Sequence, residues 1–171
     1  MFKYLIYPLK PLIEIKISED QRQRAIAISN PDKVFNKNKT GKRAGYIGAL
    51  GEVIVADYLG IKPHNDEEIW NYDMKLNDTK IEVKTMNLYK QPQSYTDCCT
   101  TTYYQQQCDM YVFVGLLNDK SKAWIEGCIP TKEFYEKAKL IKAGTKRERD
   151  GFVYSWDNWV VTVADLHELK V

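Results

Sequence analysis

The sequence predicts a single α/β domain, and three observations lead to that prediction. Residues 42–59 repeat apolar side chains at helical spacing, residues 69–76 and 80–85 have strand character on either side of a tight turn, and residues 110–117 form a continuous apolar run. A helix followed by a hairpin and a buried strand is typical of a sheet covered by helices. With 171 residues, the chain is long enough for one domain with its own core.

The N-terminal part combines short strands, a capped helix and a basic loop. Ser18 and Gln21 have the spacing of a capping box, which predicts a helix over residues 21–29. Residues 30–41 are polar and lysine-rich without periodicity, so we expect a loop. Before the helix, alternating apolar residues predict one or two short strands, kept at an edge or in a turn by prolines: Phe2, Tyr4 and Ile6, then Ile13, Ile15 and Ile17, with Pro8 and Pro11 between them.

The clearest helix covers residues 42–59, because apolar side chains recur there at helical spacing and Gly60 closes the pattern: Ile47, Leu50, Ile54 and Tyr58. Residues 61–68 are expected to form a loop. Strands are predicted over residues 69–76 and 80–85, joined at Asn77-Asp78.

The rest of the chain adds strands and a second helix. The apolar run 110–117 predicts a central strand, and residues 89–107, which are polar, receive no assignment. The remaining predictions are a turn at 118–122, a strand at 123–129, a helix capped by Thr131 and ending near Ala143, a charged loop at 144–151, a strand at 152–163 and a helical turn at 164–169.

Composition excludes several classes of protein. A chain with 44% apolar and 28% charged residues is unlike a disordered segment. No secretory signal is recognisable, and no stretch approaches the ~20 apolar residues of a membrane helix. The four cysteines, of which Cys98 and Cys99 are adjacent, do not have zinc-site spacing. Free thiols in a reducing compartment account for them, so we predict a cytoplasmic protein.

Charge is distributed unevenly along the chain. Residues 1–45 contain ten Lys or Arg against four Asp or Glu, whereas the remaining residues contain fifteen against nineteen. A basic arm beside an acidic body suits a protein that binds phosphates with one part and cations with the other. A solvated basic face is the equally simple alternative.

The hairpin carries the residues with the clearest chemistry. If Asn77-Asp78 is a two-residue loop, Leu76 pairs with Thr79 and opposed residue numbers sum to 155. Asp73 then lies across from Glu82 on one face, with Cβ atoms ~5 Å apart. Lys84 shares that face because side chains alternate along a strand. The other face, toward the core, takes Met74, Ile81 and Val83.

Two opposed carboxylates repel each other unless a cation lies between them. Hard oxygen ligands at this spacing suit Mg²⁺ or Mn²⁺. Lys84, two residues beyond Glu82, can contact an attacking water or a phosphate. The alternative is an ordinary surface hairpin in which Asp73 and Glu82 form exposed ion pairs with neighbouring lysines.

Glu52 is a further candidate on the helix at 42–59. Its neighbours at i−4, i−3 and i+4 are Gly48, Ala49 and Ala56. Small side chains let a helix approach a sheet closely and leave the carboxylate room to reach a site. The alternative is an exposed glutamate flanked by alanines that favour helix formation.

The predicted long helix contains Gly51-Glu52, and Tyr72-Asp73 and Ile81-Glu82-Val83-Lys84-Thr85 follow it in the chain. In this order, the three segments resemble the PD-(D/E)xK nuclease superfamily, which includes restriction endonucleases and junction resolvases. The resemblance covers about residues 42–143, including the strands at 109–114 and 123–127. Tyr72 stands where the proline that names the motif is expected. The resemblance implies a restriction-endonuclease-like sandwich, with a central mixed sheet of four or five strands flanked by helices.

The resemblance also implies roles and boundaries. Asp73 and Glu82 would bind Mg²⁺ or Mn²⁺, Glu52 would add a carboxylate, and Lys84 would assist the nucleophilic water. The domain would comprise a basic N-terminal extension at 1–41, a nuclease core at 42–143, and a C-terminal strand and helical turn at 144–171. The implied activity is hydrolysis of phosphodiester bonds in DNA, with RNA as an alternative substrate and a homodimer as an alternative to a monomer. A module of the same fold that binds nucleic acid without catalysis is the competing function.

Other residues are candidates for contacts with nucleic acid. Each cluster has a plain alternative as a solvated polar loop. Two basic clusters beside an acidic site nevertheless favour a nucleic-acid substrate. The candidates are Lys39, Lys42 and Arg43 before or at the start of the long helix, Gln106 and Gln107 in the polar segment, and Lys146, Arg147 and Arg149 in the charged loop.

Overall fold

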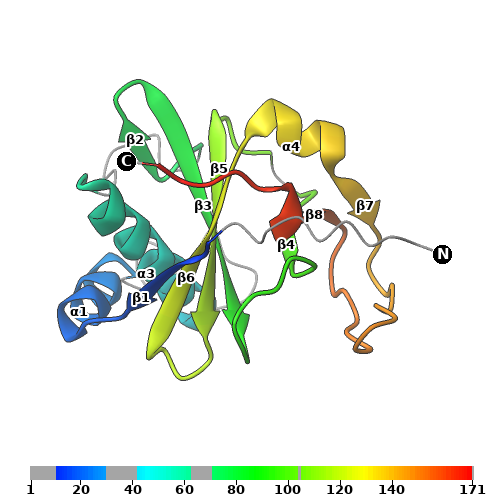
Figure 1. Cartoon of the computed structure of the whole chain (residues 1–171), viewed down its shortest axis with the longest axis horizontal. Helices are drawn as coiled ribbons and strands as arrows, with labels where there is room; N and C mark the ends of the chain where they lie inside the picture. Colours follow the sequence, from blue (N-terminus) through cyan, green and yellow to red (C-terminus); the bar gives the residue numbers. More distant parts are fainter. Residues whose placement is uncertain (1–10, 30–41, 63–70, 104, 171) are drawn as a thin grey trace.

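A computed structural model describes residues 11–29, 42–62, 71–103 and 105–170 (Figure 1). The helices are α1 (Glu19–Ile28), α3 (Lys42–Leu59) and α4 (Thr131–Lys137), with a 3-10 turn at Val163–Asp165. The strands are β1 (Ile13–Lys16), β2 (Met74–Leu76), β3 (Thr79–Leu88), β4 (Asp97–Thr101), β5 (Met110–Leu117), β6 (Lys122–Pro130), β7 (Lys139–Ile141) and β8 (Asn158–Thr162). The chain is therefore α/β, as the sequence predicts.

Within the described residues, five strands form the central sheet, in the order β1-β6-β5-β3-β2. The sheet is mixed because β3 and β5 run parallel, whereas the other neighbouring pairs are antiparallel. The predicted mixed sheet of four or five strands is therefore confirmed, with five strands. The finer likeness to restriction endonucleases stays a prediction.

The first strand, β1, belongs to the central sheet, and the first helix, α1, packs against α3. β1 pairs with β6 at the edge of the central sheet. The Ser18 side chain accepts a hydrogen bond from the Gln21 amide, and the Gln21 side chain accepts one from the Ser18 amide, so the predicted capping box is confirmed. Gln21 also donates to Asp57 of α3 at 2.9 Å, which joins the two helices.

Two apolar cores lie on opposite faces of the central sheet. On one face, α3 packs against alternate residues of β3 and β5, including Ile81, Val83, Val112 and Val114. On the other face, Tyr111 and Phe113 of β5 pack with Phe134 of α4 and with residues of β4 and β8. Figure 1 shows α1 and α3 on one side of the sheet, and α4 with the smaller sheet on the other. The alternation of β3 therefore sends Glu82 and Lys84 away from α3, toward the smaller sheet.

The smaller sheet has the order β4-β8-β7 and is not predicted from the sequence. β4 lies within residues 89–107, whose polar composition carries no strand signal. Its residues still pair with β8 from Asp97↔Thr162 to Thr101↔Asn158. Tertiary pairing has outweighed local preference in this segment.

The helix predicted from Thr131 to about Ala143 is wrong in its second half. α4 ends at Lys137 and Ala138 has extended backbone angles, after which β7 pairs with β8. Thr131 is the first helical residue and not the cap, because Pro130 occupies the cap position. Helical spacing continues past Lys137, but the edge of β8 supplies hydrogen bonds that a longer helix would forgo.

Several other boundaries differ from those predicted. β2 begins at Met74 and β8 covers only Asn158–Thr162, so both are shorter than predicted, whereas β3 continues to Leu88. The helical turn predicted at 164–169 is a 3-10 turn at Val163–Asp165, followed by an isolated bridge between His167 and Cys128. The predicted strand at 2–6, the loop at 30–41, most of the loop at 61–68 and the start of the strand at 69–76 lie outside the described residues. None of the described helices has the length and apolar character needed to span a membrane.

At Gly51, α3 lies too close to β3 to leave room for a side chain. A Cβ atom on Gly51 would overlap Oγ1 of Thr85 and come within 3.0 Å of its Cβ and Cγ2. Gly48, by contrast, has no atom within 4 Å of where its Cβ would lie. The sequence had attributed close packing to Gly48, Ala49 and Ala56. Ala49 and Ala56 are indeed buried, but Gly51 allows the tight contact and Gly48 leaves open space.

Gly51→Ala is therefore expected to lower the free energy of unfolding by about 1–3 kcal/mol, because the added methyl must displace the β-branched Thr85. Gly48→Ala is the matched control on the same helix. It should raise stability by up to about 1 kcal/mol, since alanine has the higher helix propensity and space is available. Urea denaturation followed by circular dichroism measures both. Equal stability of the two variants would contradict the close contact.

Candidate active site

The predicted register of the hairpin is confirmed for three residue pairs. Leu76 pairs with Thr79, Lys75 with Lys80, and Met74 with Ile81. Asn77 adopts a positive φ of 53°, a conformation that asparagine tolerates better than most residues. The ladder ends at Met74, so Asp73 lies one residue beyond it and not within it.

Asp73 is held at the end of β2 by two backbone hydrogen bonds. Its amide donates to the Ile81 carbonyl at 2.9 Å. Its Oδ2 accepts from the Val83 amide at 2.7 Å. The carboxylate therefore satisfies a donor of β3 where β2 no longer does so. This arrangement places Asp73 beside β3 next to Glu82, although not as a ladder pair.

Glu82 and Lys84 lie together on the face of β3 that points away from α3. Glu82 is buried, with 7% of its surface exposed, and Lys84 is half-buried. The Lys84 Nζ donates to Glu82 Oε1 at 2.7 Å. A lysine bound to a buried carboxylate keeps its ammonium in one position, next to any group that approaches Glu82.

The electrostatics of Asp73 bring Glu52 into the same cluster. Loss of hydration raises the pKa of Asp73 well above its usual range, and the negative charges of Glu52 and Glu82 raise it further. The Val83 amide and the Lys84 ammonium act in the opposite direction. The charges of Glu52 of α3 and of Glu82 and Lys84 of β3 therefore all act on Asp73 at the end of β2.

The chemistry of these donors fits a divalent cation. A positive charge next to Asp73 would offset the negative charges of Glu52 and Glu82 that raise its pKa, and Mg²⁺ and Mn²⁺ prefer such oxygen ligands. As they lie here, no three His, Cys, Asp or Glu side chains within the described ranges form a ready group of metal ligands. Asp73 and Glu82 each have an oxygen bonded to a protein donor instead.

Lys84 also lines a cavity of about 840 Å³ between the central sheet and the smaller sheet. Glu126 of β6 lines the same cavity and is almost completely buried, at 1% exposed. The β5–β6 register shifts between Phe113 and Val114, so Glu126 is the extra residue of a β-bulge. Sequence reasoning missed Glu126, although a glutamate inside an otherwise apolar strand was a visible signal.

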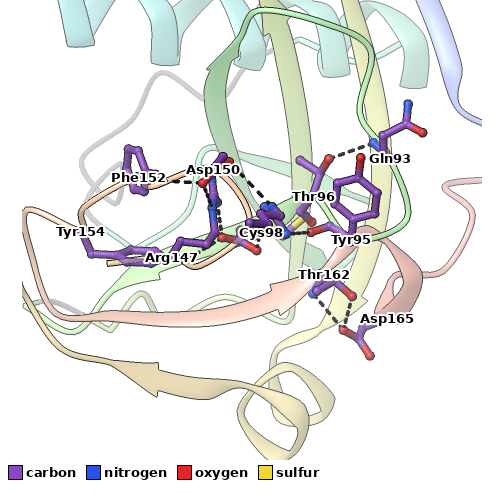
Figure 2. Close-up of polar contacts among 12 residues, drawn as sticks. Gln93, Tyr95, Thr96, Cys98, Arg147, Asp150, Phe152, Tyr154, Thr162 and Asp165 are labelled. Carbon is purple, nitrogen blue, oxygen red and sulfur yellow. Dashed lines mark hydrogen bonds and ion pairs between the residues drawn. The ribbon is translucent and has the colours of Figure 1, made fainter. Parts of the chain in front are cut away.

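A network around Asp97 forms one wall of this cavity. Asp97 is buried and accepts hydrogen bonds from Arg147 and from the Tyr154 hydroxyl, while Arg149 lies 3.4 Å from its other oxygen. Arg147 also pairs with Asp150 at 2.7 Å. Figure 2 shows Arg147 and Asp150 side by side near Tyr154. The network joins the loop between β7 and β8 to the start of β4.

The candidate contacts with nucleic acid occupy different surroundings. Arg147 and Arg149 bind carboxylates, so they hold the loop as well as adding positive charge. Lys146 is exposed on the same loop, and Gln106 and Gln107 precede β5, half-buried and exposed respectively. Lys39 and the side chains of Lys42 and Arg43 lie outside the described part of the chain. A role of these residues in binding stays a prediction.

Comparisons with known proteins add no relative. No family model matches the chain, and no curated protein or solved structure matches it. The functional conclusion therefore depends on the arrangement of the chain's own residues.

Asp97→Asn is expected to lower the free energy of unfolding by on the order of 3 kcal/mol, because it removes the buried negative charge that Arg147, Arg149 and the Tyr154 hydroxyl share. Asp150→Asn removes a more exposed carboxylate of the same loop and should cost less than about 1 kcal/mol. Chemical denaturation of both variants measures the difference. An unchanged denaturation midpoint for Asp97→Asn would show that the network does not stabilise the fold.

Proposed function

We propose that this protein is a metal-dependent nuclease that hydrolyses phosphodiester bonds in DNA, with the restriction-endonuclease-like fold that its motif implies. We expect an endonuclease with structure-selective or weak sequence specificity. Mg²⁺ is the expected cofactor, with Mn²⁺ as a substitute.

The proposal is carried by the charges of Glu52, Glu82 and Lys84 that act on Asp73, together with the 2.7 Å ion pair between Lys84 and Glu82. Folding gains nothing from the two carboxylates, Glu52 and Glu82, that raise the pKa of Asp73, so their proximity to Asp73 is a cost to stability. Clusters with strongly shifted pKa values concentrate at functional sites. Carboxylates next to a lysine match what phosphodiester hydrolysis requires: ligands for a cation and a positive group for the reacting phosphate.

The residues divide the chemistry among them. Asp73, Glu82 and Glu52 would hold the divalent cation, which supplies a Lewis acid that activates water and offsets charge on the phosphate. The Lys84 ammonium, held 2.7 Å from Glu82, orients the nucleophile or stabilises the additional negative charge of the transition state. The Val83 amide keeps the Asp73 carboxylate at the end of β2, so this ligand needs little rearrangement.

The competing function is binding of nucleic acid without cleavage. The absence of a ready three-ligand group among the described side chains is the observation in its favour. Cleavage assays separate the two functions directly, because a binding module retains nucleic acid but releases no product when Mg²⁺ is added.

Lys84→Ala and Glu82→Gln are expected to reduce the cleavage rate at least about 100-fold with the fold retained, because each removes a group that acts on the reacting phosphate or its cation. The matched control is Lys75→Ala, which removes an exposed lysine of the same hairpin and should leave the rate unchanged. A Mg²⁺ or Mn²⁺ titration with linear, nicked and branched DNA provides the measurement. Cleavage by Lys84→Ala at the wild-type rate would overturn the assignment.

A further inference from the structure

The cavity beside Lys84 extends well beyond the proposed catalytic cluster. It is lined by the second half of β3 and the residues that follow, by the start of β4, and by the loop between β7 and β8. Phe113 and Val114 of β5 and Glu126 of β6 also line it. A volume of about 840 Å³ is within the range of sites that hold small molecules or short segments of polymer.

Exposed aromatic rings gather around this cavity. Five aromatic residues in the described ranges are exposed, and four of them line it: Tyr89, Tyr95, Phe152 and Trp156. Tyr89 is 88% exposed and Trp156 is 49% exposed. Contact of large apolar rings with water is unfavourable. A group of such rings at one cavity therefore indicates a ligand with flat apolar faces.

Positive groups accompany the rings. The Arg149 guanidinium lies 5.0 Å from the centre of the Tyr95 ring, and that of Arg147 lies 4.9 Å from the centre of Phe152. Figure 2 shows the Arg147 and Phe152 side chains next to each other. These contacts support the rings from the protein side, while about half of each ring residue stays exposed. Lys84 and the exposed Lys90 add positive charge along the same cavity.

We infer that this cavity binds an unpaired strand of DNA and leads it to Lys84. The inference rests on the proposed nuclease function and adds the substrate class, namely single-stranded segments of DNA. Bases stack on exposed aromatic rings without regard to sequence, and the phosphates between them pair with nearby lysine and arginine side chains.

The balance of charge favours a single strand over a duplex. Four cations line the cavity, but three carboxylates line it too: Asp97, Glu126 and Asp150. Duplex binding depends on many phosphate contacts and needs a strongly positive surface. Stacking needs fewer charges and uses the rings, which a duplex cannot reach because its bases are already stacked.

Binding without added metal tests this inference separately from cleavage. Fluorescence anisotropy in EDTA would compare a labelled 12-nucleotide single strand with a duplex of the same sequence. Wild-type protein should bind the single strand more tightly. Tyr89→Ala and Trp156→Ala should each weaken that binding at least about fivefold, since each removes one stacking ring. Tyr103→Ala is the matched control, because Tyr103 is 78% exposed and lies outside the cavity lining.

The outcomes of binding and cleavage are independent. Equal effects of Tyr103→Ala and Tyr89→Ala, or tighter binding of the duplex, would overturn the inference even if Mg²⁺-dependent cleavage occurs. Tight binding that depends on Tyr89 and Trp156, without cleavage of any DNA, would support the cavity and overturn the nuclease. Tyr89 is 88% exposed and Trp156 is 49% exposed, so circular dichroism should show that both variants keep the wild-type fold.

Discussion

The contact between Gly51 of α3 and Thr85 of β3 sets the distance between the main helix and the sheet. Any side chain at residue 51 would collide with Thr85 and separate the two elements. Glu52 follows directly in the helix, and its charge acts on Asp73. The same close packing that buries Leu50 and Val53 therefore also brings a carboxylate of the helix to the hairpin.

The central strand β3 serves both cores through its alternation. Ile81 and Val83 pack toward α3, whereas Glu82 and Lys84 point toward the smaller sheet. Parallel pairing with β5 places Glu82 beside Tyr111 and Lys84 beside Phe113. Polar groups are thus surrounded by apolar ones, which weakens screening by water and strengthens every charge interaction among them.

The smaller sheet and its loop complete the cavity that opens from Lys84. The buried Asp97 binds Arg147, Arg149 and Tyr154, so the loop between β7 and β8 is tied to β4. These arginines neutralise Asp97 and support aromatic rings at the cavity. One network therefore connects the stability of the wall with the proposed stacking surface, and the cavity extends from that surface to Lys84 of the proposed catalytic cluster.

Local patterns were sufficient for the α/β class, the capping box at Ser18, the helix Lys42–Leu59 and the hairpin register, because each depends on residues close together in the chain. The motif around Glu82 and Lys84 was visible for the same reason.

Contacts between distant residues decided the rest. β7 lies where the second half of the predicted helix was expected, because it pairs with the edge of β8. β4 forms from a polar segment because it pairs with the other edge of β8. The Asp73 side chain accepts a hydrogen bond from the Val83 amide beyond the end of the β2–β3 ladder. Gly51, and not Gly48, allows the close contact with the sheet, and a bulge places Glu126 at the cavity. No local pattern specifies such choices, since their free energy comes from partners that only the folded chain brings together.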